Sequence, residues 1–216
     1  MPSRRTAAQV LDDDDGRVVR GRSTRERLVT TARAEFGERG YEATSIDAIL
    51  EGAGVARGAL YHHFASKEAL FSAVLDHVVA ELARKVRETA RAHSDPAESL
   101  KAGSLAWLRL ALDPAVQRIM LLDAPAVVGW TRWRTLDDEH TLGATKAALR
   151  RLAKAGRLPA TATDTLAHLI LAAVGETALL IARAEDPAAA QAAGEAALQI
   201  LLDRLLGAEP RERRTG

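Results

Sequence analysis

Apolar residues recur along most of the chain at intervals of three and four positions, which is the spacing of one face of an α-helix. Between Ser23 and Leu82 short turns interrupt this pattern, so the segment is predicted to hold four helices. The first ends near Gly37 and Gly40, two short helices lie between Thr44 and Phe64, and a long amphipathic helix leads to Leu82. This part of the chain is therefore predicted to be a small helical domain.

The rest of the chain is also predicted to be helical. Asp-Pro pairs stand at positions 95–96, 113–114 and 186–187. An aspartate can cap the free amides of a helix and proline fits the first helical position, so each pair is predicted to open a helix. Hydrophobic residues make up 47% of the chain but aromatic residues only 4%, so Leu, Val, Ile and Ala must form the core. This mixture favours an all-α fold.

The last two predicted helices, residues 163–184 and 187–206, are apolar almost all the way round. A helix with so little polar surface must be covered on two sides. One side is the core of its own subunit, and the other is either a second copy of the chain or the rest of a larger monomeric bundle. We expect a homodimer with a four-helix interface, because the many small residues allow close packing. The predicted interface residues are Ile170, Val174, Thr177, Ile181, Ala193, Ala197, Ile200 and Leu201.

The chain contains no cysteine, which excludes disulfides, thiolate zinc sites and cysteine nucleophiles. Residues 1–21 have no apolar core of the signal-peptide type, and we find no run of about eighteen apolar residues such as a spanning helix needs. We therefore expect a soluble, cytoplasmic protein without a membrane segment.

The formal net charge of +1 gives no global argument for a nucleic-acid partner, so local charge must decide. No Asp or Glu lies between Gly54 and Lys67, whereas hydrogen-bond donors are frequent there. Two short helices joined by three residues, over about residues 45–64, are typical of a helix-turn-helix that holds its second helix in a major groove. Gly54 is expected to supply a positive φ in the turn, and Val55 to fill the gap between the helices.

Four sequence runs in this region resemble the N-terminal domain of tetracycline-repressor (TetR) family regulators. They are YEATSI, AGV, GALYHHF and SKEAL, at residues 41–46, 53–55, 58–64 and 66–70. The pattern Leu-Tyr-x-x-Phe followed by Ser-Lys-Glu is the most specific part. The resemblance covers about residues 22–82.

The resemblance implies an all-α protein with a three-helix, helix-turn-helix DNA-binding domain at residues 22–82. A helical-bundle domain for ligand binding and dimerisation is expected at residues 83–206. Residues 1–21 and 207–216 are polar and charged, so both are predicted to be disordered tails. Arginines of the first tail either enter a minor groove or belong to a solvated tail.

The resemblance also implies which residues meet the DNA. The expected recognition surface consists of Arg57, Gly58, Ala59, Tyr61, His62 and His63, and the expected phosphate contacts are Thr44, Ser45 and Lys67. Arg57 suits the O6 and N7 atoms of guanine, while Gly58 lets the backbone approach closely. Leu60 and Phe64 are expected to face the core. The sequence departs from the family pattern at Leu50 and Gly52, and a glycine within a helix costs about 1 kcal/mol relative to alanine.

The resemblance places a ligand pocket in the second domain, where all three tryptophans lie. The residues expected to line it are Trp107, Met120, Asp123, Val127, Trp130, Trp133 and His140. The tryptophans fit equally well as core anchors. The implied function is a sequence-specific double-stranded DNA-binding regulator, a repressor released from a palindromic operator by an unidentified small molecule. No cofactor is expected, and the choice between repressor and activator stays open.

A metal site and an enzyme are the competing interpretations. His62, His63 and His77 are metal-ligating residue types, but adjacent histidines on one helix point about 100° apart and no carboxylate stands at ligand spacing. The chain has no Gly-x-Ser-x-Gly, HExxH or phosphate-loop motif, so we expect neither a metal site nor an enzyme. DNA binding with a steep salt dependence distinguishes the regulator from an enzyme that turns over a substrate without DNA.

Overall fold

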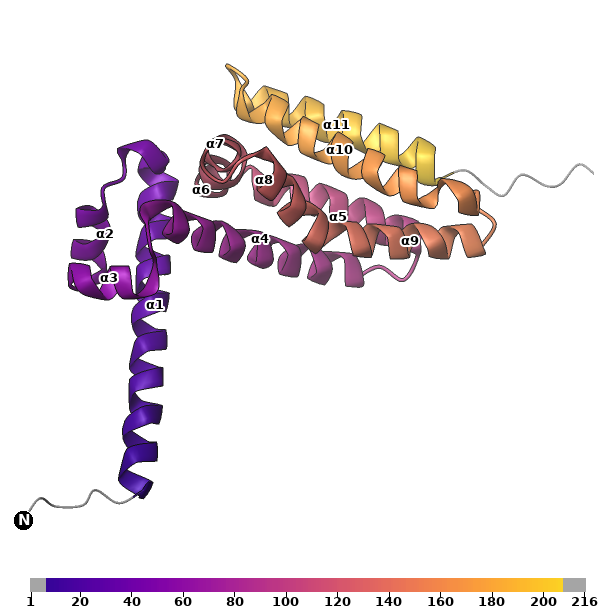
Figure 1. Ribbon diagram of the computed structural model, residues 1–216. Helices are drawn as coiled ribbons and strands as arrows, with labels where there is room; N and C mark the ends of the chain where they lie inside the picture. The colour runs from indigo at the N-terminus through magenta and orange to yellow at the C-terminus, as the bar shows by residue number, and fades with distance from the viewer. Residues whose placement is uncertain (1–6, 208–216) are drawn as a thin grey trace, which may run out of the picture. The chain divides into compact units, whose positions relative to one another are not determined.

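A computed structural model describes the backbone of residues 7–207, and within them the side chains of residues 22–136 and 139–207 (Figure 1). The described chain is helical and has no strand, which confirms the all-α prediction. It divides into two compact units, one up to Val74 and one from Leu75 on, and the division falls inside helix α4. We call them the N-terminal unit and the C-terminal unit.

The N-terminal unit contains α1 (Ala7–Ala43), α2 (Ile46–Ala53), α3 (Arg57–His63) and the start of α4 (Lys67–Arg91). Both α2 and α3 pack on α1. The largest fully buried side chains of the unit are Leu28, Phe36, Ile49, Leu60, Leu70 and Phe71. The Phe36 and Phe71 rings meet edge to face, with their centroids 5.2 Å apart. These helices confirm the four that the hydrophobic spacing predicts.

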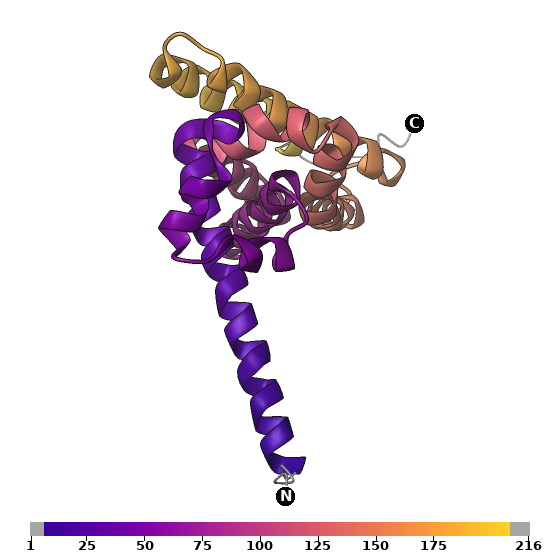
Figure 2. The same ribbon diagram turned by 60° about the vertical axis from the view of Figure 1, so that its left-hand side comes forward.

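Helix α1 begins earlier than the sequence pattern predicts. The prediction placed its start at Ser23 after a disordered tail, but the helix runs from Ala7, and residues 7–22 extend away from α2 and α3 (Figure 2). The packed part of α1 already provides the helix nucleus, so each further residue adds a hydrogen bond without a second nucleation cost. The first tail is thus helical from Ala7 on; residues 1–6 and the tail beyond Gly207 lie outside the described residues. At the other end the helix continues through Gly37, and Gly40, with φ 79°, kinks it close to the second of the two glycines predicted to end it.

The C-terminal unit holds the remaining helices. They are α5 (Pro96–Ala111), α6 (Pro114–Val116), η1 (Gln117–Asp123), α7 (Ala124–Val127), α8 (Trp130–Asp137), η2 (Asp138–Leu142), α9 (Gly143–Lys154), η3 (Ala160–Ala162), α10 (Thr163–Ala182) and α11 (Pro187–Leu206). Asp95, Asp113 and Asp186 each accept hydrogen bonds from two backbone amides at the start of α5, α6 and α11. The Asp-Pro pairs therefore open helices as predicted.

Segments η1 and η2 are π-helical, and each continues the α-helices on both sides of it. Pro125 explains the first of them. In η1 the amide of Ala124 donates to the carbonyl of Ile119 rather than to that of Met120, and Pro125 has no amide to offer Met120 in its place. The indole Nε1 of Trp133 supplies the missing donor and lies 2.7 Å from the Met120 oxygen. The carbonyl that proline leaves without a backbone donor is thus satisfied by a side chain of the neighbouring helix α8.

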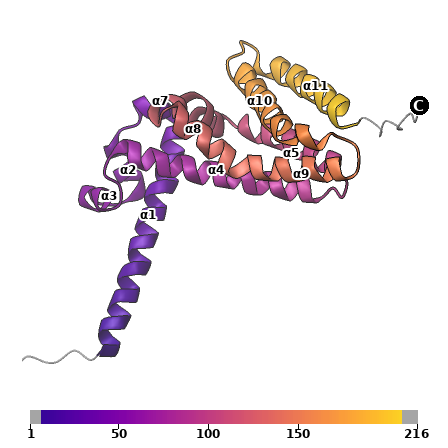
Figure 3. The same cartoon turned by 45° about the vertical axis from the view of Figure 1, so that its right-hand side comes forward.

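Helices α10 and α11 lie side by side, and α10 also packs on α5 and α9 (Figure 3). Residues 160–182 are long and apolar enough to cross a membrane by length and composition alone, a run that the sequence analysis did not find. Only 28% of that stretch is buried within the chain. An exposed apolar face therefore remains on this helix.

The predicted interface register on α10 is wrong. Ile170, Val174 and Ile181 are at most 3% exposed, so they belong to the core of the subunit. Thr177 faces the neighbouring helix, because a Cβ on Gly194 of α11 would lie 2.9 Å from its Cγ2 atom. A helix that is apolar all round carries no polar stripe to mark its outer face, which is why the sequence pattern chose the buried side.

The outer face of this helix pair is nevertheless apolar. Leu169 and Leu180 on α10 are 58% and 64% exposed, and Ile200 and Leu201 on α11 are 63% and 46% exposed. Ala193 and Ala197 are exposed on α11 as well. We call these six residues the α10/α11 face; its α11 members are among the predicted interface residues, whereas Leu169 and Leu180 are not.

Candidate functional site

The turn between α2 and α3 has the geometry that its sequence predicts. The Ser45 hydroxyl caps α2 by accepting a hydrogen bond from the amide of Ala48 at 3.1 Å. The helix ends at Gly54, which takes the left-handed conformation at φ 62°, as expected. Helix α3 then begins at Arg57, so only three residues separate the two helices.

Two residues of α1 fix this turn, and the sequence pattern did not single out either of them for this role. The Arg27 guanidinium donates hydrogen bonds to the carbonyls of Ala53 and Gly54 at the end of α2. A cation is favourable at a helix C-terminus, where carbonyls lack intrahelical partners. A Cβ on Gly52 would lie only 2.8 Å from the Thr31 side chain, so this glycine lets α2 pack closely on α1. The departure from the family pattern at Gly52 is thus explained by the close packing of α2 on α1.

Helix α3 has one buried and one exposed face. Leu60 is fully buried and Phe64 is 5% exposed, which confirms that both face the core. Arg57, Gly58, Tyr61 and His62 are exposed, and Ala59 and His63 are partly buried. A Cβ on Gly58 would meet no described atom within 4 Å, so packing within the described structure does not require glycine there.

Arg57 has an acidic partner despite the acid-free window in the sequence. Its guanidinium pairs with the carboxylate of Asp47, which lies in the first turn of α2. This hydrogen bond raises the pKa of the Arg57 guanidinium above its usual value. Asp47 was missed because it lies on α2, ahead of the window, and only the fold brings it beside Arg57 of α3.

The environment of His63 favours its neutral form. Burial lowers the pKa of the imidazole, and the nearby His62 and Arg25 lower it further. The guanidinium of Arg25 lies 5.2 Å from the centroid of the Phe64 ring, so α1 contributes positive charge beside the end of α3. His63 can therefore donate or accept a hydrogen bond at neutral pH.

The other two expected phosphate contacts, Thr44 and Lys67, also have partners within the unit. Thr44 is 1% exposed, and its hydroxyl donates to the carbonyl of Gly40 at 2.8 Å, so the prediction for Thr44 is wrong. Its hydroxyl is used inside the unit, where an unpaired polar group would be costly. Lys67 is partly buried, with its Nζ 4.3 Å from the centroid of the Tyr41 ring. It also donates to the carbonyl of Glu42 at 3.5 Å.

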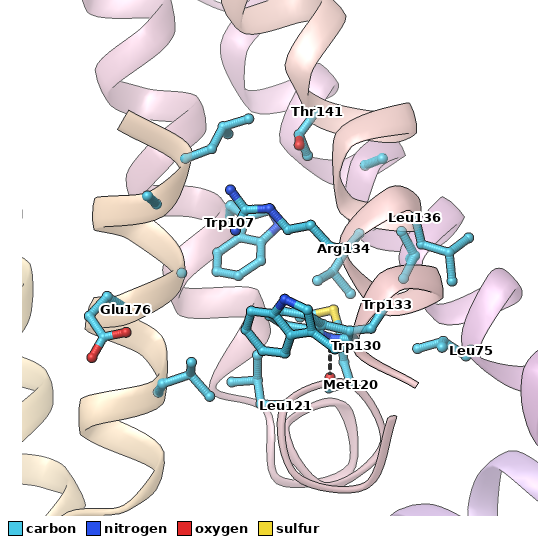
Figure 4. A pocket seen from close by; sticks show the side chains of 17 residues that line it. Leu75, Trp107, Met120, Leu121, Trp130, Trp133, Arg134, Leu136, Thr141 and Glu176 are labelled. Atoms are coloured by element: carbon cyan, nitrogen blue, oxygen red, sulfur yellow. Dashed lines mark hydrogen bonds between the residues drawn. The ribbon is translucent and has the colours of Figure 1, made fainter. Parts of the chain in front are cut away.

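The C-terminal unit contains a cavity of about 200 Å³, which we call the tryptophan cavity (Figure 4). Trp107, Trp130 and Trp133 all line it, and the ring centroids of Trp130 and Trp133 lie 4.7 Å apart. Apolar side chains such as Leu75, Met120, Leu121 and Leu136 form much of the remaining wall. Among the described side chains, its charged lining residues are Arg134 and Glu176. An apolar enclosure with few polar groups is typical of a small-molecule site.

The predicted pocket residues divide into three groups. Trp107, Met120, Trp130 and Trp133 line the tryptophan cavity, whereas His140 lines a second, adjoining cavity. Asp123 and Val127 line neither cavity. Sequence reasoning missed Arg134, Glu176 and the contribution of α10, because the inward face of these helices follows from tertiary packing.

The N-terminal unit therefore has the form of a helix-turn-helix DNA-binding module, and the C-terminal unit is a helical body with internal cavities. Comparison with known families agrees. Residues 28–74 match the model described as "Bacterial regulatory proteins, tetR family", and residues 97–205 match "Tetracyclin repressor-like, C-terminal domain". The chain belongs to the TetR family of transcriptional regulators.

Similar proteins support this assignment. A crystal structure of a TetR-family transcriptional regulator from Pectobacterium atrosepticum is 35% identical, covers 96% of this chain and 100% of its own, and has a TM-score of 0.77. RolR in complex with resorcinol is 18% identical, with coverage of 90% and 98% and a TM-score of 0.66, and shows the fold alone. The HTH-type transcriptional repressor AcnR of Corynebacterium efficiens is 28% identical over 152 residues, which are 70% of this chain and 78% of that protein.

Proposed function

We propose that this protein is a transcriptional repressor that binds a palindromic operator as a homodimer and is released by a small molecule. The outward face of α3 carries this proposal. It presents Arg57, Tyr61 and His62 on a short helix whose other face is anchored by Leu60. An exposed helix rich in donors at the second position of a helix-turn-helix is suited to base edges and phosphates in a major groove.

Gly58 supports the same proposal. Glycine lowers helix stability relative to alanine, and the described structure leaves open space where a Cβ would lie. A close approach of DNA to the backbone of α3 would explain the glycine, because a side chain at this position would stand between the backbone and the DNA. In this arrangement Arg57 reads a base, and Ala59 offers a methyl group. Tyr61, His62 and His63 complete the surface.

Contacts to phosphates are proposed to flank α3. Ser45 is exposed, and its hydroxyl proton is free for a phosphate while its oxygen caps α2. Lys67 remains a proposed contact because part of its side chain is accessible beside Tyr41. Both residues lie at helix starts, where the helix dipole favours an anion.

The homodimer is proposed to form through the α10/α11 face. Large exposed apolar side chains are costly in water, and a second copy related by a two-fold axis covers all of them in one four-helix contact. Two subunits then present two recognition helices, which suits half-sites about 34 to 36 Å apart on B-DNA.

The tryptophan cavity is the proposed effector site. RolR, which shares the fold, has been solved with resorcinol, an aromatic molecule, and this cavity has three tryptophans in its wall. A ligand that binds better to a conformation unable to hold both half-sites lowers DNA affinity by its difference in affinity for the two states. Repression is favoured because relatives such as AcnR are named repressors.

Footprinting of the DNA upstream of the protein's own coding region tests the proposal. We expect protection of one palindromic site, with an affinity that falls steeply as the salt concentration rises. Protection without sequence preference would contradict a specific operator. An added compound that removes the footprint would identify an effector.

A further inference from the structure

A second cavity of about 300 Å³ adjoins the tryptophan cavity in the C-terminal unit. Ala83, Trp107, Thr141 and Leu171 line both cavities, so the two share a wall. We call the second one the arginine cavity, because Arg87 and Arg91 of α4 and Arg151 of α9 line it. His140 belongs to the same lining, and among the side chains that the structure describes no Asp or Glu does.

The three arginines differ from their neighbours in one respect. On the same two helices, Arg84 pairs with Glu88 at 2.7 Å and Arg150 pairs with Asp164 at 3.3 Å. By contrast, Arg87, Arg91 and Arg151 have no ion-pair partner within the part of the chain that the structure describes. A group of cations without carboxylates attracts an anion, and guanidinium groups bind carboxylates and similar oxyanions in forked geometry.

A hydroxyl group in the lining suits the same kind of occupant. Ser104 lines the arginine cavity, is 8% exposed and has no hydrogen-bond partner among the described residues. This hydroxyl can donate a hydrogen bond to an anion in the cavity. The π segment η2 contributes His140 and Thr141 to the lining, and such segments are frequent at functional sites.

We propose that the two cavities together hold one amphipathic organic anion. Its apolar, aromatic body lies among the tryptophans, and its acidic group lies among Arg87, Arg91 and Arg151. Trp107 and Thr141, which line both cavities, flank the junction between the two parts. The inference deepens the proposed function, since this anion is the effector class, but ligand binding can be measured without DNA.

Two dyes with the same ring skeleton test the charge requirement in the full-length protein. 8-Anilinonaphthalene-1-sulfonate carries a sulfonate, whereas N-phenyl-1-naphthylamine is neutral. All three tryptophans line the cavity, so quenching of their emission reports binding of either dye. In the variant with Arg87→Gln and Arg91→Gln we expect the affinity for the sulfonate to fall roughly tenfold or more, and that for the neutral dye to change by less than about twofold.

The control variants are Arg84→Gln and Arg150→Gln, which remove one arginine from each of the same helices outside the cavity lining. Both should bind the two dyes like the wild type. Equal sulfonate affinity in the cavity and control variants would overturn the proposal. So would an equal loss for both dyes, because that indicates a deformed cavity and not a lost charge contact.

A third variant tests whether one ligand spans both cavities. Gly175 lines the tryptophan cavity, and a Cβ there would meet no described atom within 4 Å, so Gly175→Leu fills that space. Both dyes should bind more weakly to this variant if its circular dichroism is that of the wild type. Unchanged binding of the sulfonate would contradict a single ligand that occupies both cavities.

DNA binding of the same variants separates this inference from the proposed function. The cavity arginines lie in the C-terminal unit, so their variants should keep the wild-type footprint. A protein that binds no specific DNA but loses the sulfonate with Arg87 and Arg91 would support the ligand class and refute the repressor. Specific DNA binding together with charge-independent dye binding would refute the ligand class alone.

Discussion

The two units satisfy their polar groups in different ways. In the N-terminal unit, Arg27, Thr44 and Ser45 satisfy backbone groups at the ends of α1 and α2. In the C-terminal unit, two helical segments have π geometry. Two cavities adjoin one another in this unit, and three arginines that line one of them have no ion-pair partner in the described structure. The first arrangement holds a surface in one shape, whereas the second leaves room and charge for a guest molecule. The proposed function, which combines DNA binding with the sensing of a ligand, places these opposite demands on one chain.

The largest expected effect comes from the α10/α11 face, because this face is proposed to join the two copies. Ile200→Glu places a charge on a residue that is 63% exposed and is proposed to be covered by the partner. We expect monomers in sedimentation experiments and an operator affinity lower by roughly 100-fold or more, since the two heads are no longer linked. Gln199→Glu, at the exposed neighbouring position, should stay dimeric. A dimeric Ile200→Glu variant would contradict this interface.

Removal of the donors of α3 should have the next largest effect. The double variant with Arg57→Ala and Tyr61→Ala loses two exposed side chains, so its thermal unfolding should match that of the wild type. Its affinity for the operator should fall by roughly 100-fold, and its preference over unrelated DNA should disappear. Electrophoretic mobility shifts with both DNAs measure this. Operator affinity equal to that of the wild type would refute the proposed recognition surface.

Arg27→Ala tests whether the stability of the N-terminal unit depends on the hydrogen bonds between α1 and the end of α2. The change leaves the carbonyls of Ala53 and Gly54 without the guanidinium that they accept from. We expect the free energy of unfolding to fall by about 1 to 2 kcal/mol, measured by urea denaturation. Arg22→Ala, on the same helix, is the control and should change stability by less than about 0.5 kcal/mol. A variant as stable as this control would show that Arg27 does not anchor the turn.

Trp133→Phe makes the corresponding test in the C-terminal unit. Phenylalanine keeps most of the ring but cannot donate to the Met120 carbonyl, which Pro125 deprives of a helical partner. We expect a loss of about 1 kcal/mol in unfolding free energy, because a poorly solvated acceptor is left unpaired. Operator affinity without ligand should stay the same. Wild-type stability would mean that water replaces the indole.

These residues also show what a sequence pattern can and cannot predict. Local rules placed Gly54 at a positive φ, turned Leu60 inward and opened helices at the Asp-Pro pairs, because each depends on a few neighbouring residues. The contacts of Arg27 and Asp47 join separate helices, so no local spacing reveals them. The register of α10 failed for a different reason: its outer and inner faces are equally apolar.

Asp47→Asn has the smallest expected effect and tests the ion pair that occupies Arg57 on the exposed surface of α3. In the free protein the Asp47 carboxylate pairs with Arg57, so the proposed contact of the guanidinium with a base requires DNA to displace it. The pair is exposed, with 54% of the arginine side chain and 76% of the aspartate side chain accessible, so its rupture costs little. We expect operator affinity to rise by about twofold to fivefold and discrimination against unrelated DNA to fall, because a negative charge that repels phosphates is also lost. Titrations at several salt concentrations measure both effects. A lower operator affinity in Asp47→Asn would mean instead that the carboxylate orients Arg57 for the base. The Arg57 side chain would then be held in its DNA-binding position in the free protein, as the backbone of the turn before α3 is.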